Sequence, residues 1–237
     1  MLSARPGPAP LPGDFRNDEP EYRGKGGGKK GRGKGKGGKG GDNSKGKGKT
    51  GGFQSMGLTP GVYKSVMRKG YRVPTPIQRK AIPVIMQGKD VVAMARTGSG
   101  KTMAYLLPAL QKVLNAQKSG QGQGLECLVL VPTRDLCAQV KREADELAKE
   151  CDGAFACAAL SSGVSQAAAR ASLALGACPA LLVATPGRLA AAMRDGTLAK
   201  TRLAALQTLV LDEADLLLSY GYEEDLTLLA GAVSRAC

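Results

Sequence analysis

The sequence predicts an α/β protein built on a doubly wound parallel sheet. Short apolar runs alternate along the chain with longer segments of helical periodicity, and the first run leads through a glycine loop into a helix. Alternation of this kind is typical of parallel strands whose connecting helices cover both faces of the sheet. The runs that we expect to be strands are Val91–Met94, Glu126–Val131, Phe155–Leu160, Ala180–Ala184 and Leu206–Leu211.

Helices are expected before and between these runs. Thr59 and Pro60 open the first, because proline suits the first helical position, and Val62, Val66 and Met67 form its apolar face. The other helices expected are Pro76–Met86 with a bend at Pro83, a segment from Lys101, Arg134–Glu150, Val164–Leu175, Gly187–Met193 and a segment from Leu216 onward.

Charge divides the chain into two parts. The formal net charge is +14, and the first 50 residues carry +8 of it, with 13 Lys or Arg against 5 Asp or Glu. Residues 23–49 are nearly all Gly and Lys and cannot bury a core, so residues 1–52 are expected to be a disordered basic tail. Such a tail is a solubilising linker, a polycation that holds nucleic acid non-specifically, or a nuclear-targeting segment. Residues 53–237 are expected to form the ordered domain.

Cysteine and histidine usage excludes some classes of protein. Six cysteines occur without a Cys-x-x-Cys pair and the chain has no histidine, so a zinc site is not expected. The residues after Met1 do not form a secretory signal, and no apolar run approaches the length that spans a membrane. These features predict a reduced, intracellular protein without a membrane partner, whose cysteines mostly fill its core.

The segment from Asp90 to Thr102 has the order of a phosphate-binding loop: strand, glycine loop and helix. Gly98 and Gly100 let the backbone turn its N–H groups inward, and the helix dipole favours an anion at the same place. Lys101 would neutralise the β- and γ-phosphates, and the Thr102 hydroxyl would hold Mg²⁺. The general pattern begins with Gly where this chain has Ala95, and the alternative is a tight turn with an incidental lysine. The expected nucleotide-binding residues of this loop are Ala95, Arg96, Thr97, Gly98, Ser99, Gly100, Lys101 and Thr102.

Acidic side chains follow the last predicted strand, at the sheet edge where ligands sit in open α/β sheets. Asp212 at the strand tip suits Mg²⁺ coordination, and Glu213 beside it is placed to orient or deprotonate an attacking water. The alternative is that these acids only cap a helix start. Together with the phosphate loop they predict a nucleotide-hydrolysing site.

These segments resemble the DEAD-box RNA helicase family, because residues 212–215 read Asp-Glu-Ala-Asp. The family's other motifs occur in the same order. Gly70–Gln78 resembles its adenine-reading segment, with Phe53 at the upstream aromatic position. Further matches are Pro132–Leu136, in which Asp135 replaces the family's Glu, Ser162-Gly163 in place of two glycines, and Thr185–Arg188.

The resemblance implies the first helicase domain of a RecA-like P-loop NTPase, which binds ATP and Mg²⁺ and hydrolyses ATP to remodel RNA. It implies that Gln78 reads adenine, that Phe53 and Tyr71 pack near the base, and that Lys101, Asp212 and Glu213 are catalytic. RNA would be held by its backbone, with little sequence preference. The residues implied in RNA binding are Pro132, Thr133, Arg134, Gly163, Thr185, Pro186, Gly187 and Arg188.

Asp212–Asp225 is most similar to nucleolar members that act in large-subunit ribosome assembly, and Phe53–Lys101 also resembles another nucleolar member. The resemblance therefore implies the nucleolus and pre-ribosomal particles. It also implies that the second helicase domain, with its arginine finger, and one strand of this domain are absent from this chain. We then expect an exposed sheet edge, weak binding of ATP–Mg²⁺ and negligible hydrolysis by the chain alone. The alternatives are a P-loop ATPase that moves proteins or small molecules, and a non-catalytic ATP- and RNA-binding fragment.

Overall fold

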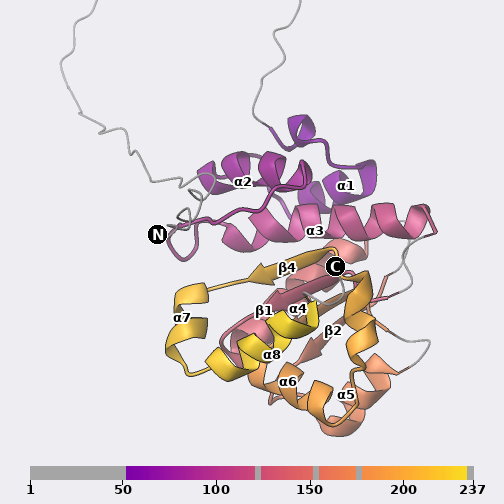
Figure 1. Ribbon diagram of the computed structural model, residues 1–237. Helices are drawn as coiled ribbons and strands as arrows, with labels where there is room; N and C mark the ends of the chain where they lie inside the picture. Colours follow the sequence, from indigo (N-terminus) through magenta and orange to yellow (C-terminus); the bar gives the residue numbers. More distant parts are fainter. Residues whose placement is uncertain (1–51, 121–123, 152–154, 175–177, 234–237) are drawn as a thin grey trace, which may run out of the picture.

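A computed structural model describes residues 52–120, 124–151, 155–174 and 178–233. Four parallel strands form one sheet in the order β2-β3-β1-β4, as the sequence predicts for a doubly wound fold (Figure 1). The strands are β1 (Cys127–Leu130), β2 (Cys157–Leu160), β3 (Leu181–Ala184) and β4 (Thr208–Leu211). The predicted disordered tail lies outside the described residues, except for Gly52.

The two central strands are apolar throughout because helices cover both of their faces. β1 pairs with β3 on one side, where Cys127 lies opposite Leu181, and with β4 on the other, where it lies opposite Thr208. Every residue of β1 and β3 is buried, whereas burial alternates along β2. The four predicted strands that form this sheet are confirmed: β1 is one residue shorter at each end, and β2, β3 and β4 begin later than predicted but end at the predicted residues.

One face of the sheet is covered by α1 (Pro60–Arg68), α2 (Pro76–Met86), α3 (Lys101–Lys118) and α4 (Arg134–Ala148), preceded by the 3₁₀ helix η1 (Phe53–Met56). The other face carries α5 (Gln166–Leu173), α6 (Pro186–Arg194), the 3₁₀ helix η2 (Lys200–Ala205), α7 (Ala214–Ser219) and α8 (Glu223–Val233). Figure 1 shows α1, α2 and α3 on the upper side of the view and α5, α6 and α8 on the lower side. A separate apolar core fills each layer, and odd and even residues of β1 point into different cores.

Several helices begin where the sequence predicts, because residues that favour a helix start stand at these positions. Pro60 and Pro76 each follow a threonine in extended conformation, and neither proline needs an N–H partner. Thr75 and Gln78 form a complete capping box: the Thr75 side chain accepts from Gln78 N, and the Gln78 side chain accepts from Thr75 N at 2.9 Å. The start of α2 therefore fixes the Gln78 side chain.

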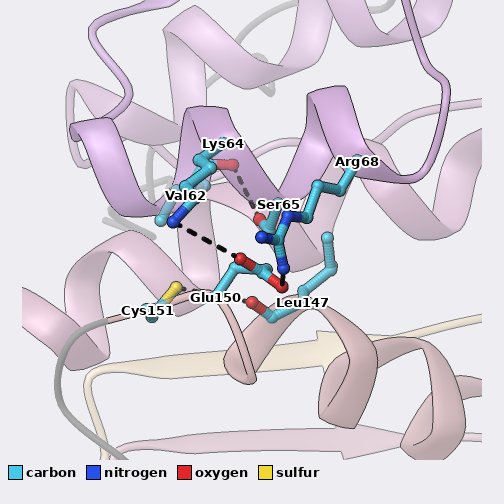
Figure 2. Close-up of polar contacts among 7 residues, drawn as sticks. All are labelled: Val62, Lys64, Ser65, Arg68, Leu147, Glu150 and Cys151. Atoms are coloured by element: carbon cyan, nitrogen blue, oxygen red, sulfur yellow. Dashed lines mark hydrogen bonds and ion pairs between the residues drawn. The ribbon is translucent and has the colours of Figure 1, made fainter.

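Helix α1 is anchored to the end of α4 by charged side chains. Glu150 lies between Lys64, at 3.8 Å, and Arg68, with which it also forms a hydrogen bond (Figure 2). Lys69, just past α1, pairs with Glu143 and with Glu146 at 2.6 Å. Surface pairs of this kind add little to stability.

The predicted strand Val91–Met94 is wrong. The chain from Asp90 to Arg96 forms no regular secondary structure, and Val92 and Met94 are both 71% exposed. A strand needs a neighbour to satisfy its backbone N–H and C=O groups. In the described part of the chain β4 pairs only with β1, and no strand lies between its outer edge and this segment. The apolar run therefore lacks the partner that would make it a strand.

The outer edge of the sheet carries exposed apolar side chains, as expected for an edge without a covering strand. Leu209 and Leu211 of β4 are exposed. The predicted helix from Leu216 onward is two helices, α7 and α8. Gly221 lies between them at φ 77°, a left-handed conformation that interrupts a helix at low cost only for glycine.

Cys127, Cys137 and Cys151 are buried, in agreement with the prediction that most cysteines fill the core. None of the described helices has the length and apolar character needed to cross a membrane.

Glu126, directly before β1, is a buried acid without a partner. Its exposed fraction is 1%, and within the described ranges neither carboxyl oxygen accepts a hydrogen bond. Burial raises the pKa of this carboxyl above 4.5 because the charged form loses its hydration. The folded protein therefore binds this proton more tightly than the unfolded chain does, and stability falls as pH rises above 4.5 towards the folded-state pKa.

We expect Glu126→Met to stabilise the fold by about 1–3 kcal/mol at neutral pH, because methionine fills the same space without an unsatisfied carboxyl. The decline in stability above pH 4.5 should become shallower in the variant. Urea unfolding at several pH values measures both effects. Glu224→Met on exposed α8 is the matched control, and an equal gain there would contradict the assignment to burial.

Candidate functional site

The carboxyl ends of the four strands meet at one edge of the sheet, where the candidate residues lie. Hydrogen bonds continue across the strand ends: Thr185 N donates to Leu160 O at 3.1 Å, and Asp212 N donates to Leu130 O at 2.9 Å. The loop after each strand therefore lies beside the loop after its neighbour. The segments that begin at Pro132, Ser161, Thr185 and Asp212 are brought together in this way.

The predicted glycine loop ends at the first turn of α3. Gly98 has φ 78° and Gly100 has φ 90°, so both use the left-handed freedom for which the sequence analysis selected them. Lys101 is the first residue of α3, and it forms no ion pair with any carboxylate in the described part of the chain. The Ser99 hydroxyl is buried without a partner among those residues. The loop thus presents a free cation and an unpaired hydroxyl beside a helix N-terminus, which favours an anion.

Gln78 connects α2 to this loop. Its side-chain Nε2 donates to Gly100 O at 3.1 Å, its side-chain oxygen accepts from Thr75 N, and the residue is 4% exposed. A Cβ at position 100 would lie 2.5 Å from Gln78 Nε2, so this contact also requires glycine there. The predicted adenine-reading residue is therefore also an anchor of the loop, a role that the sequence analysis did not assign.

The two aromatic residues expected near a base lie in different surroundings. Phe53 is 2% exposed and belongs to the core under α1 and α2, where its ring covers apolar side chains. Its expected place near the base stays a prediction. Tyr71, in contrast, is exposed beside the start of α2.

Asp212 follows β4 and is 8% exposed. Its Oδ2 accepts from the Tyr105 hydroxyl at 2.8 Å, and its Oδ1 accepts from Glu213 N at 3.1 Å. Burial, followed by the Asp212 carboxylate, raises the pKa of Tyr105 far above 10.0, which keeps the phenol protonated as the donor. Sequence reasoning missed Tyr105; the available signal was its position three residues after Thr102, on the same face of α3.

Glu213 has φ 52° and ψ 51°, and it is the only non-glycine residue with positive φ in the described part of the chain. A left-handed conformation costs a side-chain-bearing residue roughly 1–2 kcal/mol. Strain of this kind is concentrated at functional sites, where the surrounding structure imposes it. Here it turns the chain from β4 into α7 directly beside Asp212.

The oxygen donors at this edge suit a small hard cation. Thr102 lies in the first turn of α3, three residues before Tyr105, and the Tyr105 hydroxyl donates to Asp212. Among the residues that the structure describes, no group of three or more His, Cys, Asp or Glu side chains is placed to hold a metal ion. A single carboxylate with a hydroxyl fits Mg²⁺, which usually binds through one or two carboxylates together with substrate phosphates and water.

The residues predicted to hold RNA line the same edge but differ in exposure. Arg134 and Gly163 are exposed, whereas Pro132, Thr185 and Pro186 are buried. Thr133, Gly187 and Arg188 are intermediate. Two of the polar side chains are partly used within the fold: Thr133 Oγ1 accepts from Leu136 N at 3.2 Å, and one guanidinium NH₂ of Arg188 donates to Val164 O at 3.3 Å.

The segment after α7 packs against two of these loops, which sequence reasoning did not anticipate. The Tyr222 hydroxyl donates to Pro132 O at 3.2 Å. Asp225 accepts from Arg194 of α6 at 2.8 Å, and a Cβ at Gly187 would lie 3.3 Å from the Asp225 carboxylate. Residues that follow Asp212 and Glu213 along the chain thus support the loops after β1 and β3.

Comparison with known proteins gives concordant matches. The family model described as DEAD/DEAH box helicase matches residues 75–236. The DEAD-box ATP-dependent RNA helicase 16 of Arabidopsis thaliana is 43% identical over 187 residues, which cover 78% of this chain and 30% of the plant protein. The ATP-dependent RNA helicase dbp9 of Neosartorya fischeri is 43% identical over 77% of this chain and 29% of the fungal protein. The chain thus spans less than a third of the length of these relatives.

Solved structures agree with the fold. The DEAD-box helicase Mss116 bound to ssRNA and UDP-BeF superposes with a TM-score of 0.69 at 30% identity, over 77% of this chain and 37% of that one. The yeast DEAD-box splicing factor Prp28 gives a TM-score of 0.66 at 30% identity, over 76% of this chain and 42% of the yeast chain.

Proposed function

Because this chain belongs to the DEAD/DEAH box helicase family, we propose that it is the ATP-binding part of an ATP-dependent RNA helicase. In this proposal the protein binds ATP with Mg²⁺, contacts the sugar–phosphate backbone of RNA, and couples ATP hydrolysis to the remodelling of RNA. The observation that carries the proposal is the approach of α3 to the end of β4. Tyr105, about one turn after Lys101 in α3, donates to Asp212 Oδ2 at 2.8 Å, and Glu213 directly follows Asp212.

The roles proposed for the nucleotide site follow from this arrangement. Loop N–H groups and Lys101 would bind the phosphates, and Thr102 and Asp212 would hold the magnesium ion, which neutralises phosphate charge. Glu213 would orient or deprotonate the attacking water, since it directly follows Asp212. Gln78 would read adenine with the donor and the lone pair that its contacts to Gly100 and Thr75 leave over.

The roles proposed for RNA binding rest on the loops that meet at the same edge. Arg134 and Arg188 would contact phosphates, and exposed Gly163 would let the RNA backbone approach closely. The loops would be shaped by three buried residues, Pro132, Thr185 and Pro186. Thr185 and the backbone groups of residues 185–187 would face the RNA. Contacts of this kind do not read bases, so little sequence preference is expected.

The finer biological setting is also proposed. The resemblance of Asp212–Asp225 to nucleolar members supports a role in ribosome assembly, with pre-ribosomal particles as partners in the nucleolus. The basic segment within residues 1–52 would add non-specific affinity for RNA.

Two measurements test the proposed function. The chain is titrated with ATP, GTP and UTP in the presence of Mg²⁺, and with single-stranded RNAs of unrelated sequence. Preference for ATP and similar affinity for each RNA are expected. Hydrolysis with and without RNA is measured on the longest protein that the gene encodes. Nucleotide binding without RNA stimulation would favour a P-loop ATPase with another partner, and RNA binding without ATP binding would favour a non-catalytic fragment.

A further inference from the structure

The hydroxyl of Tyr105 joins two elements that are otherwise held together only by apolar packing. It donates to Asp212 Oδ2 at 2.8 Å, and in the described part of the chain no other hydrogen bond connects α3 with β4 or Asp212. The segment before the glycine loop does not pair with β4 either. The phenol therefore sets the position of the Asp212 carboxylate relative to the first turn of α3.

The hydrogen bond to the second oxygen of Asp212 does not fix the position of the carboxylate relative to α3. Oδ1 accepts from Glu213 N, which belongs to the next residue and moves with Asp212. A carboxylate that is 8% exposed needs donors to offset its lost hydration, and Tyr105 is the donor that comes from the opposite side of the site. Without it the side chain would be free to rotate away from α3.

Tyr105 is also adjacent to the other oxygen donor of the site. Thr102 precedes it by about one helical turn, on the same face of α3. The hydroxyl that contacts Asp212 therefore belongs to the helix turn that also carries Thr102. The Tyr105 ring is half-buried and packs on the core beneath α3, so its position is fixed by packing.

We propose that Tyr105 is a positioning residue that holds Asp212 close to the start of α3 and so prepares the carboxylate for the magnesium ion of bound ATP. The inference rests on the proposed function. Asp212 keeps lone pairs for a metal ion or its water while it accepts from Tyr105, since an ionised carboxylate has about four acceptor sites. Tyr105 itself touches neither phosphate nor water in this proposal.

The test is Tyr105→Phe, which keeps the ring and removes the hydroxyl. ATP binding is measured at equilibrium while Mg²⁺ is titrated, and again in EDTA. The Mg²⁺ concentration for half-maximal ATP binding should rise about 3- to 10-fold, the range of one hydrogen bond of roughly 1 kcal/mol. Binding of metal-free ATP should not change. Tyr63→Phe, in a half-buried tyrosine of α1 outside the site, is the matched control.

A double-mutant cycle with Asp212→Asn shows whether the effect passes through Asp212. Tyr105→Phe should add little further change in the Mg²⁺ requirement once Asp212 is replaced, and an undiminished effect there would overturn the proposal. Thermal unfolding of each variant shows that the fold is retained. If the parent protein requires Mg²⁺ and Tyr105→Phe leaves that requirement unchanged, the inference fails. If the parent protein shows no Mg²⁺-dependent ATP binding, the proposed function fails instead.

Discussion

Lys101→Ala is expected to weaken the binding of ATP, GTP and UTP alike, by about 10- to 150-fold, the value of a hydrogen bond to a charged group. Lys101 begins α3 and has no carboxylate partner among the described residues, so its charge is available for phosphates. The loss should not depend on the base, because all three nucleotides carry the same phosphates. Isothermal titration with each nucleotide measures it, and Lys118→Ala at the other end of α3 is the control.

Gln78→Ala is the informative comparison for this experiment. It should weaken ATP more than GTP or UTP, because the amide is proposed to read adenine. A smaller loss common to all three is also expected, because the contact with Gly100 O that steadies the loop disappears. Equal losses for the three nucleotides would show that Gln78 acts only on the loop.

Glu213→Gln should lower the rate of ATP hydrolysis by about 10²- to 10⁴-fold in the longest protein that the gene encodes, the usual contribution of a general base. The affinity for ATP–Mg²⁺ should remain close to that of the parent protein, because Asp212, Thr102 and Lys101 are unchanged. Single-turnover hydrolysis and equilibrium binding separate the two effects.

The matched control for this variant is Glu224→Gln on the exposed face of α8, which should hydrolyse ATP normally. Hydrolysis that survives Glu213→Gln undiminished would assign the water-activating role to another group. A loss of ATP affinity equal to the loss of rate would instead point to damage of the site, and unfolding measurements would then show a destabilised fold.

Much of the fold could be predicted because local signals and packing agree. The central strands β1 and β3 are continuous apolar runs, and Pro60, Pro76 and Thr133 mark helix starts by their own chemistry. Val91–Met94 had the composition of a strand but lacks a neighbour in the described chain, and composition does not reveal a missing partner. The division of α7 from α8 depends on the left-handed conformation of Gly221. The apolar periodicity by itself did not indicate this break.

The site was predictable to the extent that its parts are contiguous in sequence. The left-handed glycines of the loop, and Asp212 at the end of β4, lie where their motifs place them. Contacts between distant segments were not predictable: Tyr105 with Asp212, and Tyr222 with Pro132, join residues 107 and 90 positions apart. Periodicity indicates which side of a helix is apolar, but not which hydroxyl on that side meets an acid from another element.

The left-handed backbone conformation of Glu213 lowers local stability at a residue to which we assign a chemical role. Glycine, or to a lesser degree asparagine, would adopt this conformation more readily than glutamate. Folding alone therefore does not favour glutamate at residue 213, whereas the role that we propose for its carboxylate does. In a copy of this gene released from that role, replacement of Glu213 by glycine or asparagine would relieve the strain, so we expect early substitutions at this position.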